Sequence, residues 1–226
     1  MEVVVFSTAS LDGRIATVSG DSKLSCENDL RLLHAWRCWS DLVLVGARTA
    51  EVDDPGLFVK RVPCKRQPFR GVVDGKLRVP HKLRLFEEMP WTSLVITTTF
   101  GVRKNEWKYK YLLSKGVSVV VAGDGPEVDW GKALVELSRR GIRRVLVEGG
   151  GRLTWSLVEH DLVDRMEITY VGRVLGAGTP LVSGEGFAKV SEAPLFEPVE
   201  AKFCQCGKCI HVTWLRKDIR PLKPST

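Results

Sequence analysis

Short, continuous runs of Val, Leu and Ile recur along the chain and constrain its fold more than any other feature. They lie at residues 3–6, 42–45, 71–73, 94–98, 117–121, 145–147 and 166–171. A run that is apolar at every position suits a strand buried on both faces, as in a parallel sheet covered by helices. Helical patterns separate several runs: one capped by Ser25 and reaching Trp36, one over Lys104–Lys115, one over Trp130–Arg140, and one opening at Gly149–Gly151. This alternation predicts an α/β fold with a mostly parallel central sheet flanked by helices.

The chain becomes less regular and richer in Pro after Gly184. This part is expected to add antiparallel edge strands at the C-terminal end, with Ile210–Leu215 as the last strand. We find no linker, so we expect one domain over residues 1–215. Residues 216–226 carry Pro221 and Pro224 and are expected to form a frayed basic tail.

Composition excludes several classes of protein. Of 226 residues, 44% are hydrophobic and 27% are charged, which is typical of globular proteins. No stretch approaches the ~18 consecutive apolar residues of a membrane-spanning helix, and Val3–Phe6 is too short for a signal-peptide core. Cys26, Cys38 and Cys64 are too scattered for a secreted disulfide scaffold. We therefore expect a cytoplasmic protein with reduced thiols and no membrane partner.

The formal net charge of +7 permits an anionic partner, from a phosphorylated metabolite to nucleic acid. Its distribution is uneven. Residues 202–226 hold six cations against Asp218 alone, so +5 of the +7 lies there and +2 remains for residues 1–201. The net charge therefore reports mainly on the C-terminal segment.

The most informative motif is Val145-Leu-Val-Glu148-Gly149-Gly150-Gly151-Arg152-Leu153. A buried strand ends in an acid, and three glycines then open a helix. Glycines let a ligand approach the backbone closely, and the N–H groups of a helix start bind anions. Ligands of open α/β sheets also lie beyond the carboxyl ends of strands. The motif therefore favours phosphate binding over the alternative, a tight strand-to-helix turn. It is not the G-x-G-x-x-G fingerprint of dinucleotide-binding domains.

Three further strand ends carry polar groups. After the run at 42–45, Thr49 and Asp53 are four residues apart and share a face of a short helical turn. They could hold a ribose, amide or phosphate, or they could belong to a capped turn with solvated acids, and composition does not decide. Asp12-Gly13 and Asp74-Gly75 follow other strands, and for both a solvated turn is the default reading.

Cys204, Cys206, Cys209 and His211 lie within eight residues near the C-terminus. Three thiolates and an imidazole could form a zinc site. Structural zinc sites usually pair two knuckles across a longer loop, and in an extended strand Cys209 would face away from Cys204 and Cys206. We therefore assign no metal ligand. Whether these groups bind a metal stays open, the alternative being thiols on a late strand.

Taken in order, several motifs resemble a known family. They are Ser10-Leu-Asp-Gly-Arg-Ile-Ala16, Gly20-Asp-Ser22, Arg37-x-x-Ser-Asp41, Val45-Gly-Ala-Arg-Thr49-x3-Asp53-Asp-Pro-x-Leu57, Val73-Asp-Gly-Lys-Leu-Arg-Val-Pro80 and Glu148-Gly-Gly-Gly-x-Leu153, continued by Leu162-Val-Asp164. Each is weak alone, but together they are specific. The chain resembles the stand-alone archaeal 2,5-diamino-6-ribosylamino-4(3H)-pyrimidinone 5′-phosphate reductases, and is similar to the reductase half of the bifunctional bacterial riboflavin deaminase–reductase. The resemblance covers residues 3 to 187.

The resemblance implies a dihydrofolate-reductase-like fold, NADPH as cofactor, a phosphorylated pyrimidine substrate and a homodimer, with no nucleic-acid partner. The implied reaction is reduction of the substrate's ribosyl group to ribityl, by hydride transfer to C1′ of the open-chain imine, in riboflavin biosynthesis. From the length we expect one reductase domain without an attached deaminase. In such chemistry the cofactor supplies the reactivity, and the protein orients the reacting carbons.

Matching positions imply site residues. The implied cofactor contacts are Thr8, Thr49, Asp53, Gly75, Gly149, Gly150, Gly151, Arg152 and Leu153. The implied substrate contacts are Ser22, Arg37, Leu57, Lys60 and Glu148. Arg37 would pair with the 5′-phosphate, Glu148 would accept from the pyrimidine or sugar, and Asp12 is a candidate proton relay beside Glu148 in the catalytic set. Charge and position alone place Arg103 and Lys104 near a cofactor 2′-phosphate.

The chain departs from the family pattern at Gly75, Lys60, Arg152 and Arg165, so two alternatives are kept. One is a dihydrofolate-reductase-like oxidoreductase that acts on another pterin or pyrimidine. The other, of a different class, is a zinc-bearing module that binds nucleic acid through its basic surface.

Overall fold

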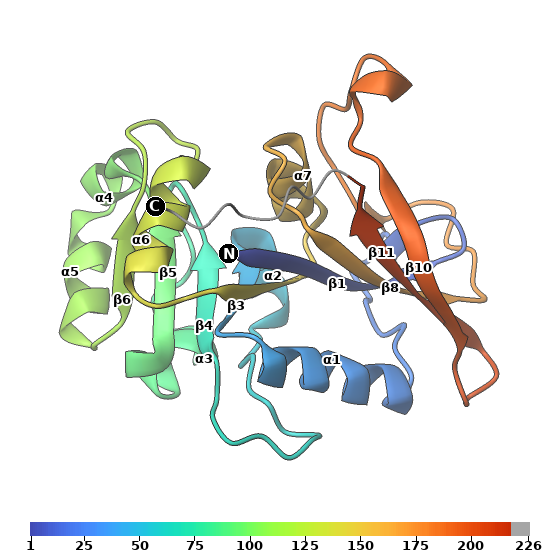
Figure 1. Ribbon diagram of the computed structural model, residues 1–226. Coiled ribbons are helices and arrows are strands. Elements are labelled where there is room, and N and C mark those ends of the chain that lie inside the picture. Colours follow the sequence, from blue (N-terminus) through green and yellow to red (C-terminus); the bar gives the residue numbers. More distant parts are fainter. Residues whose placement is uncertain (218–226) are drawn as a thin grey trace, which may run out of the picture.

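Every predicted apolar run forms a strand in the computed structural model, which describes residues 1–217. Nine strands join in one sheet (Figure 1). In spatial order they are β10 (Phe196–Phe203), β11 (Cys209–Arg216), β8 (Arg165–Val171), β1 (Glu2–Ser10), β7 (Arg144–Glu148), β3 (Leu42–Gly46), β4 (Phe69–Val73), β5 (Ser93–Thr97) and β6 (Ser118–Val121). A short separate sheet pairs β2 (Arg14–Ala16) with β9 (Thr179–Pro180).

The strands from β8 to β6 all run parallel, whereas β11 is antiparallel to β8 and β10 is antiparallel to β11. This confirms the predicted mostly parallel sheet with antiparallel C-terminal edge strands. β11 continues through Arg216, one residue beyond the predicted strand end, and the backbone N–H of Lys217 bonds the Leu195 carbonyl at 3.0 Å. The predicted tail from residue 218 onward lies outside the described residues.

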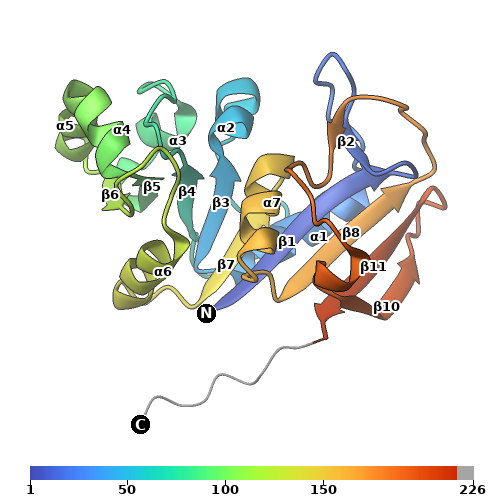
Figure 2. The same ribbon diagram turned by 90° about the horizontal axis from the view of Figure 1, so that it is seen from above.

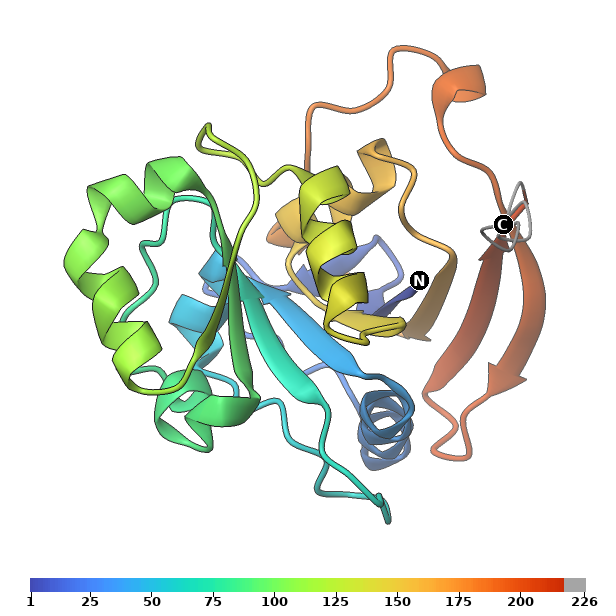
Figure 3. The ribbon, with the colours of Figure 1, turned by 60° about the vertical axis from the view of Figure 1, so that its left-hand side comes forward.

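Helices cover both faces of the sheet (Figures 2 and 3). The helices are α1 (Glu27–Trp39), α2 (Ala47–Asp53), α3 (Arg84–Glu87), α4 (Thr99–Lys104), α5 (Glu106–Ser114), α6 (Trp130–Arg139) and α7 (Gly151–Glu159), with 3-10 turns η1 (Pro90–Thr92) and η2 (Val190–Glu192). Alternate strand residues pack against α6 and α7 on one face, and against α1, α2, α3 and α5 on the other. None of the helices in residues 1–217 is both long enough and apolar enough to cross a membrane.

Two helix boundaries differ from prediction. The helix predicted to be capped by Ser25 begins one residue later than expected, with Cys26 at the N-cap position. The Ser25 hydroxyl instead lies 2.8 Å from the Thr8 hydroxyl. The helix predicted over 104–115 is α5, which begins two residues later than predicted, because Asn105 leaves the helical conformation (φ −136°, ψ 47°) and separates it from α4. Gly116 and Gly141 follow α5 and α6 with positive φ, which confirms them as stop signals.

Asp41 holds together the starts of two adjacent strands. One carboxylate oxygen accepts the backbone N–H groups of Arg143 and Arg144 at 3.0 and 2.9 Å, and the other accepts from the Arg144 and Arg66 guanidinium groups. Burial alone would raise the pKa of Asp41, but the hydrogen bonds from Arg144, Arg143 and Arg66 hold it well below its ordinary value. The Asp41 of the Arg37-x-x-Ser-Asp41 motif therefore has a structural role, at the edge of the sheet where the parallel strands begin.

We predict that Asp41→Asn lowers the free energy of unfolding at pH 7 by about 2 kcal/mol, because charge-assisted hydrogen bonds to buried groups are lost. The folded-state pKa lies below the ordinary value of 3.8, so the wild-type advantage is present above pH 3.8 and disappears as the pH falls further. Urea unfolding at several pH values measures both effects. The exposed Glu185→Gln serves as control, and a pH-independent difference would contradict the prediction.

Candidate active site at the carboxyl edge of the sheet

The residues predicted from the sequence gather where the parallel strands end. Glu148 is the last residue of β7, Gly46 ends the neighbouring β3, and Val73 ends β4 on the far side of β3. In open α/β sheets, ligands bind beyond this edge. Three motifs separated by up to about a hundred residues in sequence therefore meet in one place.

Arg37 and Glu148 form a bidentate ion pair at this edge. Arg37 Nε donates to Glu148 Oε1 and Nη2 donates to Oε2, both at 2.6 Å. Their side chains are only 13% and 12% exposed. Burial alone would lower the pKa of Arg37, but the adjacent carboxylate of Glu148 raises it above its ordinary value. Both residues were predicted to contact substrate separately, whereas in the structure they contact each other.

The pair is completed by the loop that follows α2. Arg37 Nη1 donates to the carbonyl oxygen of Phe58 at 2.9 Å. The guanidinium of Arg70 lies 4.0 Å from the centroid of the Phe58 ring and donates to the Gly56 carbonyl at 3.1 Å. Between these residues Leu57 is buried with φ +53°, a conformation that non-glycine residues rarely adopt. The loop is therefore held in one shape against the ion pair.

A disulfide joins the same loop to the end of α1. Cys38, next to Arg37, is bonded to Cys64, with Cα atoms 5.7 Å apart. The expectation that all the thiols are reduced was therefore wrong for these two residues. The widely spaced positions gave no sign of it, because only the return of the loop along α1 brings the two together. The bond restrains the loop that supplies Phe58 to Arg37.

His34 and Lys60 connect α1 to this loop a second time. The backbone N–H of Lys60 donates to His34 Nδ1 at 2.9 Å. Burial, together with the cations Arg37, Arg61 and Lys60, lowers the pKa of His34 to about 4. His34 is therefore neutral at pH 7 and has a structural role. The Lys60 side chain is exposed, and the ion pairs found within residues 1–217 do not include it.

The glycine turn joins β7 to α7. Gly149 and Gly150 have φ +58° and +85°, which glycine adopts without strain. A Cβ on Gly149 would meet no atom within 4 Å, so this backbone is open to a ligand. A Cβ on Gly151, by contrast, would lie 2.6 Å from the Pro180 carbonyl oxygen, so that glycine is required by packing. The first N–H groups of α7, including those of Arg152 and Leu153, have no partner within the helix and are suited to an anion.

Thr49 lies beside the glycine turn, but Asp53 is further along α2. A Cβ built on Gly150 would lie 3.0 Å from Thr49 Oγ1, so the hydroxyl directly adjoins the turn. Asp53 is the last residue of α2 and is exposed. Arg103 and Lys104 are exposed in the last turn of α4.

Thr8 lies in a polar network on the α1 face of the sheet. Its hydroxyl donates to Asp29 Oδ2 at 2.6 Å, and the Thr169 hydroxyl donates to Asp29 Oδ1 at 2.6 Å. Thr169 also contacts His211 Nδ1 at 2.8 Å, and His211 Nε2 lies 2.5 Å from Glu167. The Thr8 hydroxyl is thus engaged within the protein. Ser22 is exposed in the segment before α1.

Two aspartates of the family motifs hold loops. Asp12 accepts from the Ser10 hydroxyl at 2.6 Å and from the backbone N–H groups of Leu175 and Gly176 at 3.0 and 2.7 Å, and these bonds lower its pKa to about 2. Asp74 accepts from the N–H of Val79 at 2.8 Å. A Cβ on the adjacent Gly75 would lie 2.3 Å from the Pro126 carbonyl oxygen, so packing requires that glycine.

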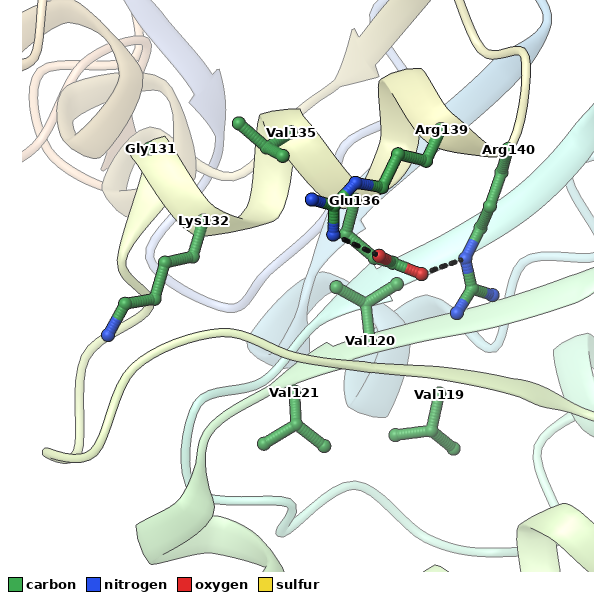
Figure 4. Close-up of a pocket in the computed structure, with 9 residues that line it drawn as sticks. All are labelled: Val119, Val120, Val121, Gly131, Lys132, Val135, Glu136, Arg139 and Arg140. Atoms are coloured by element: carbon green, nitrogen blue, oxygen red, sulfur yellow. Dashed lines mark hydrogen bonds and ion pairs between the residues drawn. The ribbon is translucent and has the colours of Figure 1, made fainter.

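A hollow on another part of the molecule contains none of these residues (Figure 4). It lies between edge strand β6 and α6, where Glu136 pairs with Arg140 at 2.9 Å and with Arg139 at 3.8 Å. Val120 packs into the core beneath α6, whereas Val121 is exposed. These charges all belong to α6 and its C-cap and pair with one another, so they provide no convergent polar groups for catalysis.

The sequence reasoning missed Arg70 and Asp29. Arg70 is fully buried within β4, with its pKa lowered to about 10 by burial. A single Arg inside the apolar run Phe69–Val73 was a usable signal, since a buried guanidinium must have partners. Asp29 reads as an ordinary acid in the first turn of a helix, and its contacts with Thr8 and Thr169 depend on the tertiary fold.

Comparison with known proteins shows the family of the chain. The family model of the RibD C-terminal domain matches residues 1–212. A 2,5-diamino-6-ribosylamino-4(3H)-pyrimidinone 5′-phosphate reductase of Archaeoglobus fulgidus is 38% identical over 200 residues, which are 83% of this chain and 88% of that protein. The protein of the same name from Methanothermobacter thermautotrophicus is 35% identical over 197 residues, covering 84% and 88%.

Solved structures show the same fold. A diaminohydroxyphosphoribosylaminopyrimidine deaminase/5-amino-6-(5-phosphoribosylamino)uracil reductase of Thermotoga maritima aligns with a TM-score of 0.77 and 27% identity, over 95% of this chain and 56% of that one. A dihydrofolate reductase of Enterococcus faecalis aligns with a TM-score of 0.52 and 13% identity, over 96% and 97%. The predicted dihydrofolate-reductase-like fold is confirmed.

The Arg37–Glu148 pair gives a direct test of the site. We predict that Arg37→Gln and Glu148→Gln each lower the free energy of unfolding by about 3 kcal/mol, because each leaves a buried charge without its partner. The double variant should lose clearly less than the sum of the two. Denaturant unfolding of all four proteins measures this coupling. The exposed pair Arg84–Glu88 is the control, with an expected coupling below about 1 kcal/mol, and a similarly small value for Arg37–Glu148 would contradict the prediction.

Proposed function

The chain belongs to the RibD C-terminal domain family, and on that basis we propose that it is an NADPH-dependent reductase of riboflavin biosynthesis. Its substrate is 2,5-diamino-6-ribosylamino-4(3H)-pyrimidinone 5′-phosphate, the compound in the names of its archaeal relatives, and its product carries a ribityl group. The observation that carries the proposal is a buried, ion-paired Glu148 directly next to an open glycine turn at a helix start. A fixed hydrogen-bond acceptor would therefore lie beside the helix start that is proposed to bind phosphates.

The residues around the glycine turn fit a nicotinamide dinucleotide. The open backbone of Gly149 and the first N–H groups of α7 would hold the pyrophosphate, with the Thr49 hydroxyl beside them. Asp53, four residues after Thr49 on α2, would accept from a ribose hydroxyl. The bound cofactor would supply the hydride that C1′ receives. Gly75 acts indirectly, by allowing the loop after β4 to pack against Pro126.

Glu148 and Lys60 are assigned to opposite ends of the substrate. Glu148 accepts hydrogen bonds from the pyrimidine amino groups or sugar hydroxyls, while Arg37 holds its carboxylate fixed in direction. Because Glu148 and Phe58 engage the Arg37 guanidinium, the exposed ammonium group of Lys60 is the better anchor for the 5′-phosphate. Leu57 shapes the loop between these groups, and Ser22 lies exposed before α1. Asp12 positions the loop at 175–176, and its role as a proton relay stays a prediction.

Family membership does not favour the two alternatives. A nucleic-acid-binding module would not require the glycine turn or a buried acceptor at the carboxyl edge. A reductase that acts on another pterin or pyrimidine shares the class of reaction but requires a different pocket. We also propose a cytoplasmic location for this reductase.

We predict that the purified protein oxidises NADPH when the ribosylaminopyrimidinone phosphate is added, and that Glu148→Gln lowers kcat/KM by about 100-fold while NADPH affinity is unchanged. Loss of the acceptor affects orientation of the substrate, whereas the residues after Gly149, at the start of α7, would hold the cofactor phosphates. Absorbance assays and fluorescence titration measure the two quantities, at a temperature where circular dichroism shows the variant folded. The exposed Glu159→Gln, on α7, is the matched control.

Parallel assays with the deaminated uracil counterpart and with dihydrofolate define the substrate. Faster turnover of either compound would overturn the substrate assignment while leaving a reductase. NADPH binding without turnover of any of the three would overturn the reductase itself. A large loss of NADPH affinity in Glu148→Gln would move that residue into the cofactor site.

We further propose that the chain forms a homodimer through β10. This strand ends the nine-stranded sheet, and nearly all of it is exposed. Val199 and Phe203 are 56% and 89% exposed there. An exposed edge strand with large apolar side chains invites pairing with another strand, and a second copy of the same strand is self-complementary about a two-fold axis.

We predict that the wild type sediments as a dimer and that Val199→Lys with Phe203→Lys sediments as a monomer, because two ammonium groups at each edge would repel the partner copy. Analytical ultracentrifugation measures the mass. Val135→Lys, which changes an exposed valine on α6, should remain dimeric. A monomeric wild type, or dissociation caused by Val135→Lys alone, would count against the β10 interface.

A further inference from the structure

Four cysteines that the proposed reductase does not use converge at one point. They are Cys26, Cys204, Cys206 and Cys209, and their sulfur atoms all lie within 4.8 Å of one another. The nearest pairs are Cys206–Cys209 at 3.5 Å, Cys26–Cys204 at 3.6 Å and Cys26–Cys209 at 3.9 Å. All four are free thiols, whereas Cys38 and Cys64 form a disulfide elsewhere. We call these four residues the cysteine cluster.

We propose that the cysteine cluster binds one zinc ion as a structural tetrathiolate site. Four sulfurs placed tetrahedrally at about 2.3 Å from one zinc ion lie about 3.8 Å from each other. The three pair distances above lie within a few tenths of an ångström of that value. Binding replaces the four thiol protons, so that Zn²⁺ and four thiols yield a Zn(S-Cys)₄ centre and four released protons, with no change of oxidation state.

The turn between β10 and β11 brings three of the ligands together. The N–H of Cys204 bonds the carbonyl of Cys209, and the N–H of Gly207 bonds the carbonyl of Cys204, both at 2.9 Å. Gly207 has φ +71°, so the chain reverses there. In an extended strand the side chains would alternate between the two faces, and Cys209 would point away from Cys204 and Cys206. Because the chain reverses here, that alternation does not apply. A Cys-x-Cys-x-x-Cys segment in this turn presents three sulfurs to one side.

The fourth ligand comes from the start of α1, not from His211. Cys26 occupies the N-cap position of this 13-residue helix. The side chain of Asn28 in the first turn donates to Cys204 Sγ at 3.6 Å, which suits a group that supports a metal ligand. His211 is instead held by Thr169 and Glu167. The fourth member of the possible ligand set is therefore Cys26, whereas the sequence had suggested His211.

Burial and position indicate a structural role. Cys209 is buried and the other three sulfur-bearing residues are half-buried, so the four sulfurs can enclose an ion without leaving an open coordination position. The cluster ties the tip of the β10–β11 hairpin to α1, across 178 or more residues of sequence (Figure 1). β10 is mostly exposed and contributes little to the core, so the hairpin is held to the rest of the sheet through β11, which pairs with β8, and the cluster adds an attachment at its tip.

The test is the zinc content of the full-length protein, purified under reducing conditions without chelator. We expect one zinc per chain by plasma mass spectrometry, and a loss of about tenfold or more in Cys26→Ser and in Cys206→Ser after desalting. The double variant Cys38→Ser with Cys64→Ser is the matched control, because it removes two cysteines outside the cluster and should keep its zinc. Chelation of the wild type should lower its melting temperature by roughly 5–10 °C.

Cobalt substitution keeps the test valid if a serine variant does not fold. Co²⁺ added to the chelated wild type should give the intense visible bands and sulfur charge-transfer absorption of a tetrahedral tetrathiolate. Absence of zinc, iron in its place, or disulfides among the four cysteines would overturn the proposal. Retention of zinc by Cys26→Ser with loss in His211→Asn would likewise overturn it, in favour of a Cys₃His site.

Discussion

The ion pair between Arg37 and Glu148 is the contact on which the arrangement of the carboxyl edge depends. It links residues 111 positions apart, and it joins three parts of the chain: α1, the end of β7 and the loop that carries Phe58. The Glu148 carboxylate is only 12% exposed, and a guanidinium with two parallel donors matches it in both distance and direction. The disulfide at Cys38 and the stacking of Arg70 on Phe58 both act on the loop that completes this contact.

Along this edge the electrostatic environment changes from negative to positive within three residues of the chain. Before Gly149, the negative carboxylate of Glu148 faces an internal cation. After Gly149, the unpaired N–H groups at the start of α7 provide positive potential. A ligand with phosphates at one end and hydrogen-bond donors at the other matches this order. Gly149 must be a glycine here, since its positive φ turns the chain between the two environments and its missing side chain leaves the backbone open.

The fold could be predicted from the sequence because its signals are local. Runs such as Val43–Val45 and Val145–Val147 are apolar at every position, which only a doubly covered strand explains, and Gly116 and Gly141 end their helices as expected.

The site was only partly predictable. Arg37 and Glu148 were identified one by one, but their pairing depends on α1 packing beneath β7. The hydrogen bonds of Asp12 with Leu175 and Gly176, and of Thr8 with Asp29, could not be predicted either, because they join segments distant in sequence. The Cys38–Cys64 disulfide and the place of Cys26 among the other thiols arise only when distant segments meet.

Helix α1 connects these features, and its two ends serve different purposes. Cys26 at its start and Arg37 in its last turn are separated by eleven residues, or about 16 Å along the axis. Between them, Asp29 is bonded to Thr8 of β1 and Thr169 of β8, so the helix is fastened to the sheet near its first turn as well as at Arg37. A helix held at both ends cannot slide along the sheet, and a fixed α1 keeps the Arg37 guanidinium in line with Glu148 to within the tolerance that catalysis requires. The proposed zinc ion would strengthen the first of these attachments. It would thereby stabilise the hairpin directly, and it would affect the carboxyl edge of the sheet only through α1.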